Sequence, residues 1–483
     1  MDLKLKNIGV VYNSNIKING ITVITGKNNT GKTTISKSLY AIISAVENLE
    51  NNALKEKQNF AFNVFNSVLT ECGLSRIYSF YDLDEDLNNE SAINIVFNNK
   101  TIRFASLSDL IDFVDKVCVE LELLSKEDIL PRIKEKDLLI RSNRFDTQWE
   151  NFQSLKYNGI KKLQQLKDTL MDDPKLIHYS NMKILKALNQ EFFSQIAPVK
   201  NIEKVTESQI SLKNDKINYY DIIISNKEVI NKETFFINAF SKCWLIDDVS
   251  VVDELNRYER FKKLSAVNNF YYGKKIYEVS PKEFKESLTV KGHREYLLEG
   301  LTKNIGEYEL SVYKNRAARI FEIINCVFDD EIKYIDGKYI CETDKLDVRN
   351  LASGSKLFLI IKVLLENGCL DDKSLLLLDE PENHLHPDWI NKLAEVIVLI
   401  QKMLSVKIVI TTHSPNFLLA LETFSKKHKT YDTFFSYVAA KKEDDYLVDF
   451  ENISDNIEKA FSHLAQPYLE MDALRYSILE DKN

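Results

Sequence analysis

Residues 26–34 read Gly26-Lys-Asn-Asn-Thr-Gly-Lys-Thr-Thr34 and fit the pattern G-x-x-x-x-G-K-[ST]. An apolar run, Ile21–Thr25, precedes them, and a helical pattern begins near Ile35. A strand, a glycine loop and a helix in this order predict a phosphate-binding loop, because the loop N–H groups converge on a phosphate at the positive end of the helix. A glycine turn with a chance lysine is the alternative, and the flanking elements disfavour it. We therefore expect the chain to bind a nucleoside triphosphate.

The loop residues have separate expected roles. Lys32 should reach the β- and γ-phosphates, and the hydroxyl of Thr33 should ligate Mg²⁺. ATP and Mg²⁺ are thus the expected ligands. The residues expected to hold the nucleotide are Gly26, Asn28, Asn29, Thr30, Gly31, Lys32, Thr33 and Thr34.

Length and composition indicate a large globular protein. The 483 residues exceed the usual limit of one hydrophobic core, so two or three packed units are expected. The net charge of −8 argues against a uniformly basic surface but leaves room for a local basic patch. The cysteines are scattered, which is typical of reduced core thiols, and no apolar segment reaches the length of a membrane span. We expect a cytoplasmic protein that does not contact a membrane.

A second motif lies in the C-terminal third, where Leu375-Leu-Leu-Leu-Asp-Glu380 is an apolar strand that ends in two carboxylates. A strand this apolar suits the centre of a sheet that is buried on both faces. Asp379 should hold Mg²⁺ through water, and Glu380 should orient and deprotonate the attacking water. A buried strand that ends in a solvated acidic turn is the alternative, which the phosphate-binding loop makes less favourable.

Two further segments contain candidate phosphate-contacting residues. His413 follows another apolar strand in Lys407–Pro415 and is expected to contact the γ-phosphate, although a lone histidine is more often structural. The spacing from Asp379 leaves room for one strand–helix–strand step in a parallel sheet. Ala352-Ser-Gly-Ser-Lys356 precedes a helical run, Leu357–Glu366, and could form an anion site, although taken alone it is a plain helix cap.

The order of these four elements resembles the ATP-binding-cassette (ABC) ATPases, in particular the soluble branch that includes the chromosome-maintenance and double-strand-break-repair ATPases. Residues 352–356 resemble the family signature, Leu-Ser-Gly-Gly-Gln. The run that begins at Asp379, Asp-Glu-Pro-Glu-Asn-His-Leu-His-Pro, is similar to the subgroup of phage-defence and overcoming-lysogenization-type ATPases. The resemblance implies an α/β fold: a P-loop ABC-type ATPase head, with a mixed sheet flanked by helices, and a large, mainly helical insertion.

The resemblance also implies a dimer, because in this family the signature serves the ATP of a partner subunit. Ser353 and Gly354 would then complete the partner's site in a homodimer or higher oligomer. Two features depart from the family pattern. The aspartate that usually follows the catalytic glutamate is replaced by the stretch 383–386, and the glutamine loop cannot be placed, with Gln148 and Gln153 as candidates.

The elements group into four expected segments. Residues 1–105 form the first half of the ATPase, ending in a hairpin at 92–104, and residues 106–319 form an inserted, mainly helical domain. Residues 320–425 form the second half, which begins with a hairpin at 332–341, and residues 426–483 form a C-terminal hairpin and a helical tail. Helical patterns are expected at 107–124, 149–171, 182–196 and 293–327, and strand-like runs at 217–224 and 235–246.

Residues 257–304 are a candidate nucleic-acid contact, because basic residues outnumber acidic ones there and the aromatic run Phe270-Tyr-Tyr272 lies among them. A solvated helix face is the more common outcome for such a pattern. The basic residues are Arg257, Arg260, Lys262, Lys263, Lys274, Lys275, Lys282, Lys285, Lys291, Arg294 and Lys303.

The chain is therefore expected to hydrolyse ATP. Its C-terminal residues offer an acidic turn at Glu443–Asp445 but no further carboxylates on neighbouring strand ends, so we expect no nuclease activity from this chain alone. The leading hypothesis is an ATPase that acts as a sensor or scaffold for a separately encoded effector, such as a nuclease, in prokaryotic antiphage defence. The alternative is a DNA-repair or recombination ATPase that clamps duplex DNA directly through residues 257–304.

Overall fold

A computed structural model gives the fold of the chain. The structure describes residues 1–47, 49–71, 78–81, 93–97, 100–104, 107–125, 145–171, 176–198, 207–214, 217–225, 228–231, 239–268, 279, 288–303, 315–335, 338–441 and 446–480. The chain divides into two compact units. Unit 1 comprises residues 1–47, 180–260 and 290–483, and unit 2 comprises residues 48–179 and 261–289.

An eleven-stranded sheet forms the centre of unit 1, and one end of it is parallel. The parallel strands lie in the order β10-β13-β14-β3-β15. Because they run in the same direction, their carboxyl ends share one edge, where ligands of open α/β sheets bind. Their bounds are Lys242–Ile246 (β10), Ser374–Asp379 (β13), Lys407–Thr412 (β14), Ile21–Thr25 (β3) and Phe434–Lys441 (β15).

The remaining strands continue the sheet in the order β16-β2-β1-β7-β8-β9. These pairs are antiparallel except for β16 and β2, which are parallel. The bounds are Val448–Asn452 (β16), Val11–Lys17 (β2), Asp2–Ile8 (β1), Ser208–Lys213 (β7), Asn218–Ser225 (β8) and Glu228–Asn231 (β9). The sheet is therefore mixed, as the sequence predicts.

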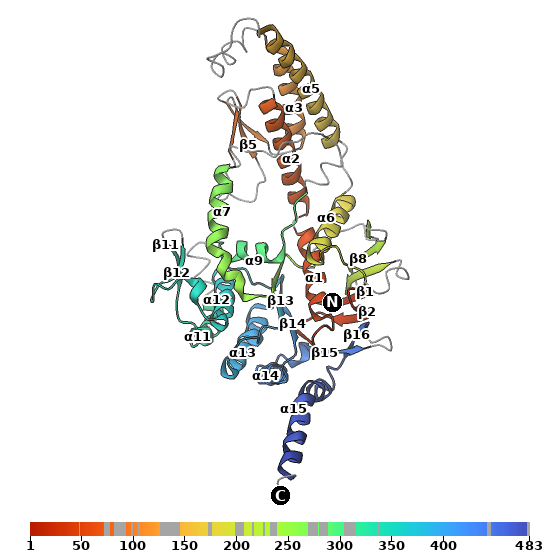
Figure 1. The fold of residues 1–483 in the computed structure, drawn as a ribbon, viewed down its shortest axis with the longest axis vertical. Coiled ribbons are helices and arrows are strands. Elements are labelled where there is room, and N and C mark those ends of the chain that lie inside the picture. The colour runs from red at the N-terminus through yellow and green to blue at the C-terminus, as the bar shows by residue number, and fades with distance from the viewer. Residues whose placement is uncertain are drawn as a thin grey trace. The chain divides into compact units, whose positions relative to one another are not determined.

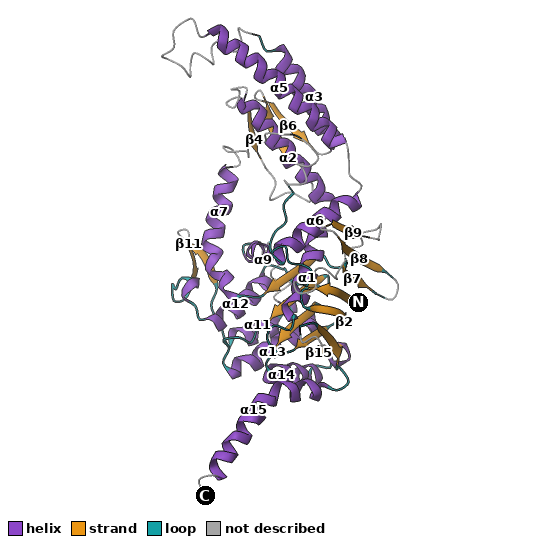
Figure 2. Ribbon diagram, turned by 45° about the vertical axis from the view of Figure 1, so that its right-hand side comes forward, coloured by secondary structure: helices purple, strands orange, loops and turns teal. Residues whose placement is uncertain are grey.

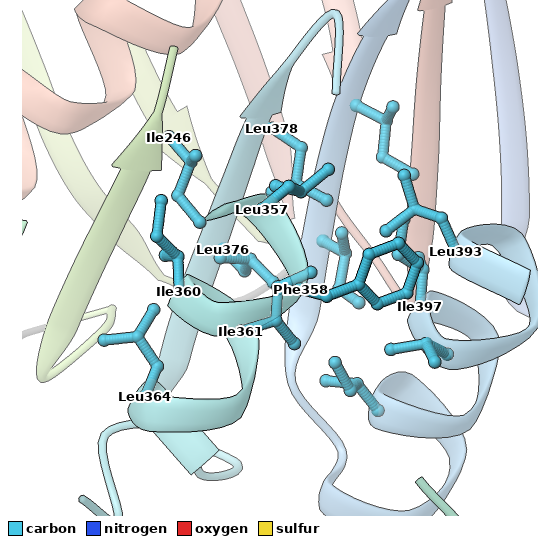
Figure 3. Close-up of a cluster of buried hydrophobic side chains, with 14 of the residues drawn as sticks. Ile246, Leu357, Phe358, Ile360, Ile361, Leu364, Leu376, Leu378, Leu393 and Ile397 are labelled. Atoms are coloured by element: carbon cyan, nitrogen blue, oxygen red, sulfur yellow. The ribbon is translucent and has the colours of Figure 1, made fainter. Parts of the chain in front are cut away.

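Helices cover both faces of the parallel strands, because alternate residues of each strand enter different cores. Leu376 and Leu378 pack against one group of helices, while Leu375 and Leu377 pack on the other face (Figure 3). The first face carries α12 (Ser353–Glu366), α13 (Pro387–Leu404) and α14 (Pro415–Lys427), which Figure 1 shows together beside β13 and β14. The second face carries α1 (Lys32–Val46) and α6 (Leu176–Glu191). The all-leucine strand is thus buried on both faces.

Smaller elements complete unit 1. Strands β11 (Ile332–Ile335) and β12 (Lys338–Cys341) form a separate hairpin. The helices are η3 (Val249–Glu254), α7 (Leu255–Asn268, which continues into unit 2), α9 (His293–Leu301), α11 (Ala318–Asn325), η4 (Val348–Asn350), η5 (Tyr431–Thr433) and α15 (Ile457–Glu480). Among the described residues, no helix is both long and apolar enough to cross a membrane.

Within its described residues, unit 2 contains helices α2, α3 and α5 and a small sheet. Helices α3 (Leu107–Leu123) and α5 (Phe145–Met171) lie side by side, and Lys167 of α5 forms an ion pair with Asp115 of α3 at 2.6 Å (Figure 2). Helix α2 (Leu49–Glu71) also packs on α5. The sheet has the order β4-β5-β6, with bounds Tyr78–Tyr81, Ile93–Phe97 and Lys100–Phe104.

The observed division differs from the expected segments in two places. The hairpin β5–β6, expected in the first half of the ATPase, belongs to unit 2, because it pairs with β4 and not with the large sheet. Conversely, β7 to β10 lie within the expected insertion but extend the large sheet of unit 1. The helical pattern at 293–327 contains α9 and α11, with residues 304–314 outside the described part. Residues 442–445, the acidic turn, are also outside it.

Candidate nucleotide site

The phosphate-binding loop connects β3 to α1 at the carboxyl edge of the parallel strands. Gly31 caps α1 with a φ of 82°, a left-handed conformation that glycine adopts without a steric penalty. A Cβ on Gly26 would lie 2.7 Å from the Cβ of Ala439, so a larger residue would displace the loop from β15. The Lys32 ammonium is buried and donates to the carbonyls of Gly26 and Lys27, each at 3.0 Å. The loop therefore wraps around its own lysine.

Thr33 and Asp379 meet across the central strands. The Thr33 hydroxyl donates to Asp379 Oδ2 at 2.6 Å, and the Thr411 hydroxyl donates to the other carboxylate oxygen. Burial raises the pKa of Asp379, and the neighbouring carboxylates of Glu380 and Asp247 raise it further. The two hydroxyl hydrogen bonds oppose this shift. Hydroxyl and carboxylate oxygens are the ligands that Mg²⁺ prefers, so this pair fits a magnesium ion and its water shell.

Glu380 lies directly after β13 in a left-handed backbone conformation, with a φ of 50°. This turn aims its carboxylate at three groups. Lys32 Nζ lies 3.2 Å away, His413 Nδ1 3.3 Å away, and the Asn383 amide donates at 3.2 Å. Burial alone would raise the pKa of Glu380, but the hydrogen bonds from Asn383 and Lys32 and the nearby positive charge hold it below its ordinary value. Glu380 is therefore an ionised carboxylate at neutral pH.

A second glutamate fixes the turn after β13. Glu382 is 6 % exposed and accepts a hydrogen bond from the Thr412 hydroxyl at the end of β14. Burial raises its pKa, although this hydrogen bond opposes the shift. Thr412 Oγ1 in turn accepts from the Ser414 N–H at 2.9 Å, which sets the backbone on both sides of His413. The sequence did not identify Glu382 as a positioning residue.

A cavity of about 650 Å³ opens over these groups within unit 1. It brings together most of the predicted nucleotide and metal residues. Gly26 underlies the loop, and His413 reaches the site through Glu380. The cavity also includes Asp247, which the sequence did not predict. The lining residues are Val10, Asn28, Asn29, Thr30, Gly31, Lys32, Thr33, Thr34, Asp247, Asp379, Glu380 and Asn383.

Ser353 and Gly354 do not line this cavity. They are the first residues of α12, which begins four residues earlier than the sequence predicts, and Ser353 is exposed there. A Cβ on Gly354 would lie 2.9 Å from Leu385 and 3.0 Å from the Trp389 ring, so close packing explains the glycine. Lys356, at the glutamine position of the signature, forms an ion pair with Asp253 at 2.7 Å.

The glutamine candidates lie elsewhere. Gln148 and Gln153 are both on α5 in unit 2 and do not follow a strand of the large sheet. At the strand end beside Asp379, where a residue could reach the nucleotide, the chain carries Asp247 instead. The position directly after β10 therefore holds an aspartate, and Gln148 and Gln153 as glutamine-loop residues stay a prediction.

The basic segment 257–304 is described only in part. Two of its basic residues are engaged by carboxylates: Lys291 pairs with Glu299 at 2.5 Å, and Arg294 pairs with Asp248 at 2.9 Å. The aromatic run 270–272 and the lysines at 274, 275, 282 and 285 lie outside the described residues. The segment as a nucleic-acid contact stays a prediction.

Part of the chain matches a known protein family, and most of it is similar to one characterised protein. Residues 342–420 match a family described as "AAA domain, putative AbiEii toxin, Type IV TA system". Endonuclease GajA of Bacillus cereus (strain HuB5-5) is 24% identical over 472 residues, which are 90% of this chain and 57% of that protein. The chain thus spans little more than half the length of this relative.

Two solved structures are also similar. The Smc head domain with a coiled coil and joint from Pyrococcus yayanosii aligns over 97% of this chain and 99% of that chain, at 10% identity and a TM-score of 0.34. The SMC head domain of Thermotoga maritima covers 93% of this chain and 97% of that chain, at 9% identity and a TM-score of 0.31. The matched family segment contains the signature-like residues 352–356, β13 and His413.

Proposed function

We propose that this protein binds Mg-ATP in the cavity above β3, β13 and β14 and hydrolyses it there. The observation that supports this most strongly is the position of the Glu380 carboxylate. It is ionised, it lies between Lys32 and His413, and it borders the cavity that the phosphate-binding loop lines.

Each side chain then has a role that follows from its chemistry. The loop N–H groups and Lys32 bind the β- and γ-phosphates, and Thr33 and Asp379 hold Mg²⁺, which supplies charge neutralisation when bound. Glu380 accepts a hydrogen bond from the attacking water and takes its proton as the bond to phosphorus forms. His413 donates to the γ-phosphate, and Asn383 keeps the Glu380 carboxylate in position.

The site is completed by a second copy of the chain. Ser353 is exposed at the N-terminus of α12 and is not part of its own chain's cavity, so its hydroxyl is available to a partner's γ-phosphate. The family resemblance assigns the N–H of Gly354 to the same contact. A head-to-tail homodimer would place each signature against the other chain's phosphate-binding loop and sandwich two ATP molecules. Hydrolysis would loosen that dimer.

In the cell, we propose that the ATPase acts as a cytoplasmic sensor or scaffold for an effector in prokaryotic antiphage defence. The motif resemblance and the similarity to a protein named as an endonuclease support this role. The effector would be encoded separately. A clamp on duplex DNA through residues 257–304 is the second candidate, and the ion pairs of Lys291 and Arg294 weaken it.

Capture of the E380Q variant from its native cells with Mg-ATP distinguishes the effector role from the DNA clamp. This variant should bind ATP and remain closed, so its partners should be retained. A stoichiometric protein partner with little nucleic acid supports the effector role. Nuclease-sensitive DNA without a protein partner would move the assignment to the clamp. The K32A variant, which should not close, is the matched control for both outcomes.

A further inference from the structure

Asp247 adds a third carboxylate to the nucleotide cavity. It follows β10, and the parallel register that pairs Ile246 with Leu378 places it at the strand end next to Asp379. Its side chain is 24% exposed and lines the cavity that also holds Lys32 and Glu380. A carboxylate here cannot bind a phosphate directly, because like charges repel. It can accept hydrogen bonds, including those from water molecules beside the phosphates.

A largely buried histidine, His293, contacts Asp247 from outside the cavity lining. His293 Nε2 lies 3.0 Å from Asp247 Oδ2, and Nδ1 of the same ring lies 2.7 Å from Glu191 Oε2. Glu191 is 3% exposed and His293 13%, so neither charge is well solvated. Burial alone would lower the pKa of His293, but the two carboxylates raise it to about 9. The three groups therefore form a carboxylate–imidazolium–carboxylate chain that runs from the interior of unit 1 to the cavity.

The middle of this chain joins segments that are distant in sequence. Glu191 is the last residue of α6, and His293 is the first residue of α9, whose N–H donates to Glu191 Oε1 at 3.2 Å. The side-chain amide of Gln190 lies 3.0 Å from both the Val290 carbonyl and the Gly292 N–H, which joins the same two segments again. Glu191 follows the return of the polypeptide from unit 2 to unit 1 at residue 180, and His293 follows the second return at residue 290.

The helix that begins in the phosphate-binding loop also contacts the histidine. The Tyr40 ring of α1 packs edge-on against the His293 ring, with centroids 5.9 Å apart. The Tyr40 hydroxyl donates to the Lys291 carbonyl at 3.0 Å. The imidazole is thus enclosed by α1, α6, α9 and the end of β10, and its position cannot change without a change in at least one of them.

We propose that Glu191, His293 and Asp247 form a positioning chain for ATP hydrolysis, which fixes the Asp247 carboxylate at the cavity edge and ties it to both segments that return from unit 2. This proposal rests on the proposed ATPase function. The imidazolium fixes the direction of the Asp247 carboxylate, and its positive charge limits the repulsion between that carboxylate and a bound polyphosphate. Asp247 then orders water beside the phosphates, and movement of α6 or α9 alters that order.

The test is a set of kinetic and binding measurements on D247N, H293Q, E191Q and the double variant D247N/E191Q. A positioning chain predicts that each single variant lowers kcat by about tenfold or more while the Kd for ATP changes by less than about threefold. The double variant should be no slower than the slower single variant, because residues that act as a unit are not additive. Asp247 and Glu191 touch only through His293, so this non-additivity would not follow from two separate structural defects.

The His428–Glu395 pair supplies the matched control. His428 Nε2 lies 3.0 Å from Glu395 Oε1, the histidine is 9% exposed, and neither residue lines the nucleotide cavity. H428Q should lose about as much thermal stability as H293Q, but its kcat should stay that of the unmodified protein. If H293Q does not fold, the kcat values of D247N, E191Q and their double variant still test the proposal. A D247N protein that keeps its kcat within about twofold, or an additive double variant, would overturn the proposal. If the unmodified protein does not hydrolyse ATP at all, the proposed function itself is contradicted.

Discussion

The Thr33 hydroxyl donates to the Asp379 carboxylate at 2.6 Å, although the two residues are 346 positions apart in sequence. Thr33 is the second residue of α1 and Asp379 ends β13, and β14 separates β13 from β3 in the sheet. The contact therefore depends on the order of three parallel strands. It joins the phosphate-binding loop to the acidic strand end and is the geometric centre of the proposed site.

Replacement of Lys32 should abolish tight ATP binding. The ammonium is expected to bind two phosphates, and loss of such charge-assisted hydrogen bonds should weaken the Kd by about 100-fold or more. Equilibrium binding of ATP to K32A checks this. K459A is the control, because Lys459 pairs with the exposed Glu451 at 2.8 Å. Unchanged ATP affinity in K32A would place the nucleotide elsewhere.

Replacement of Asp379 by asparagine should raise the Mg²⁺ concentration needed for turnover by about tenfold or more. The amide keeps the shape of the side chain but removes the charge that attracts the ion. A Mg²⁺ titration of the ATPase rate measures the shift. D371N is the control, since Asp371 bonds to Ser374 at the opposite end of the same strand. The same Mg²⁺ requirement in D379N would exclude Asp379 from the metal site.

The signature should act on the partner subunit. S353R should fold but lose hydrolysis, because it removes the hydroxyl that is expected to contact the partner's γ-phosphate. Mixing S353R with K32A should restore turnover, since one of the two composite sites per heterodimer then has both parts intact. A mixture of K32A and T33A shares the same defective part and should stay inactive. No recovery in the S353R mixture would count against a site shared between two chains.

The charged His293 should make stability depend on pH in a defined window. Because its folded pKa, about 9, is above the ordinary value of 6.5, its stabilising contribution is complete below pH 6.5 and is lost as pH rises through 9. The full difference corresponds to about 3 kcal/mol. Thermal unfolding of the unmodified protein and of H293Q between pH 6 and 9.5 measures it. The stability gap should narrow with rising pH, and a constant gap would show that His293 is not charged.

Motifs predicted the parts of the site that lie in single short segments. The loop at 26–34 was predicted from its motif between a strand and a helix, and the acidic end of β13 and His413 from strands followed by polar residues. The structure brings all three to one sheet edge. The sheet also has the predicted parallel step from β13 through α13 to β14. These features can be predicted because each functional residue directly follows, in sequence, the strand that positions it.

Asp247 was missed although its local pattern is similar. The run Lys242–Ile246 is apolar and is followed by two aspartates, as the strand before Asp379 is followed by Glu380. Its importance depends on β10 pairing with β13, which is distant in sequence and which no local pattern reveals. For the same reason the hairpin pattern at 92–104 did not show that β5 also pairs with β4, because a hairpin pattern does not specify its third strand.

The most direct test of the account compares ATP binding and ATP turnover in E380Q with those of the unmodified protein. Glutamine keeps the hydrogen bond from Asn383 but cannot accept the proton of the attacking water. We predict an unchanged or tighter Kd for ATP and a kcat lower by about 10²–10⁴-fold, with E422Q, which alters a carboxylate paired with Lys426, as the control. Near-normal turnover in E380Q would contradict the account, because another group would then have to act as the base.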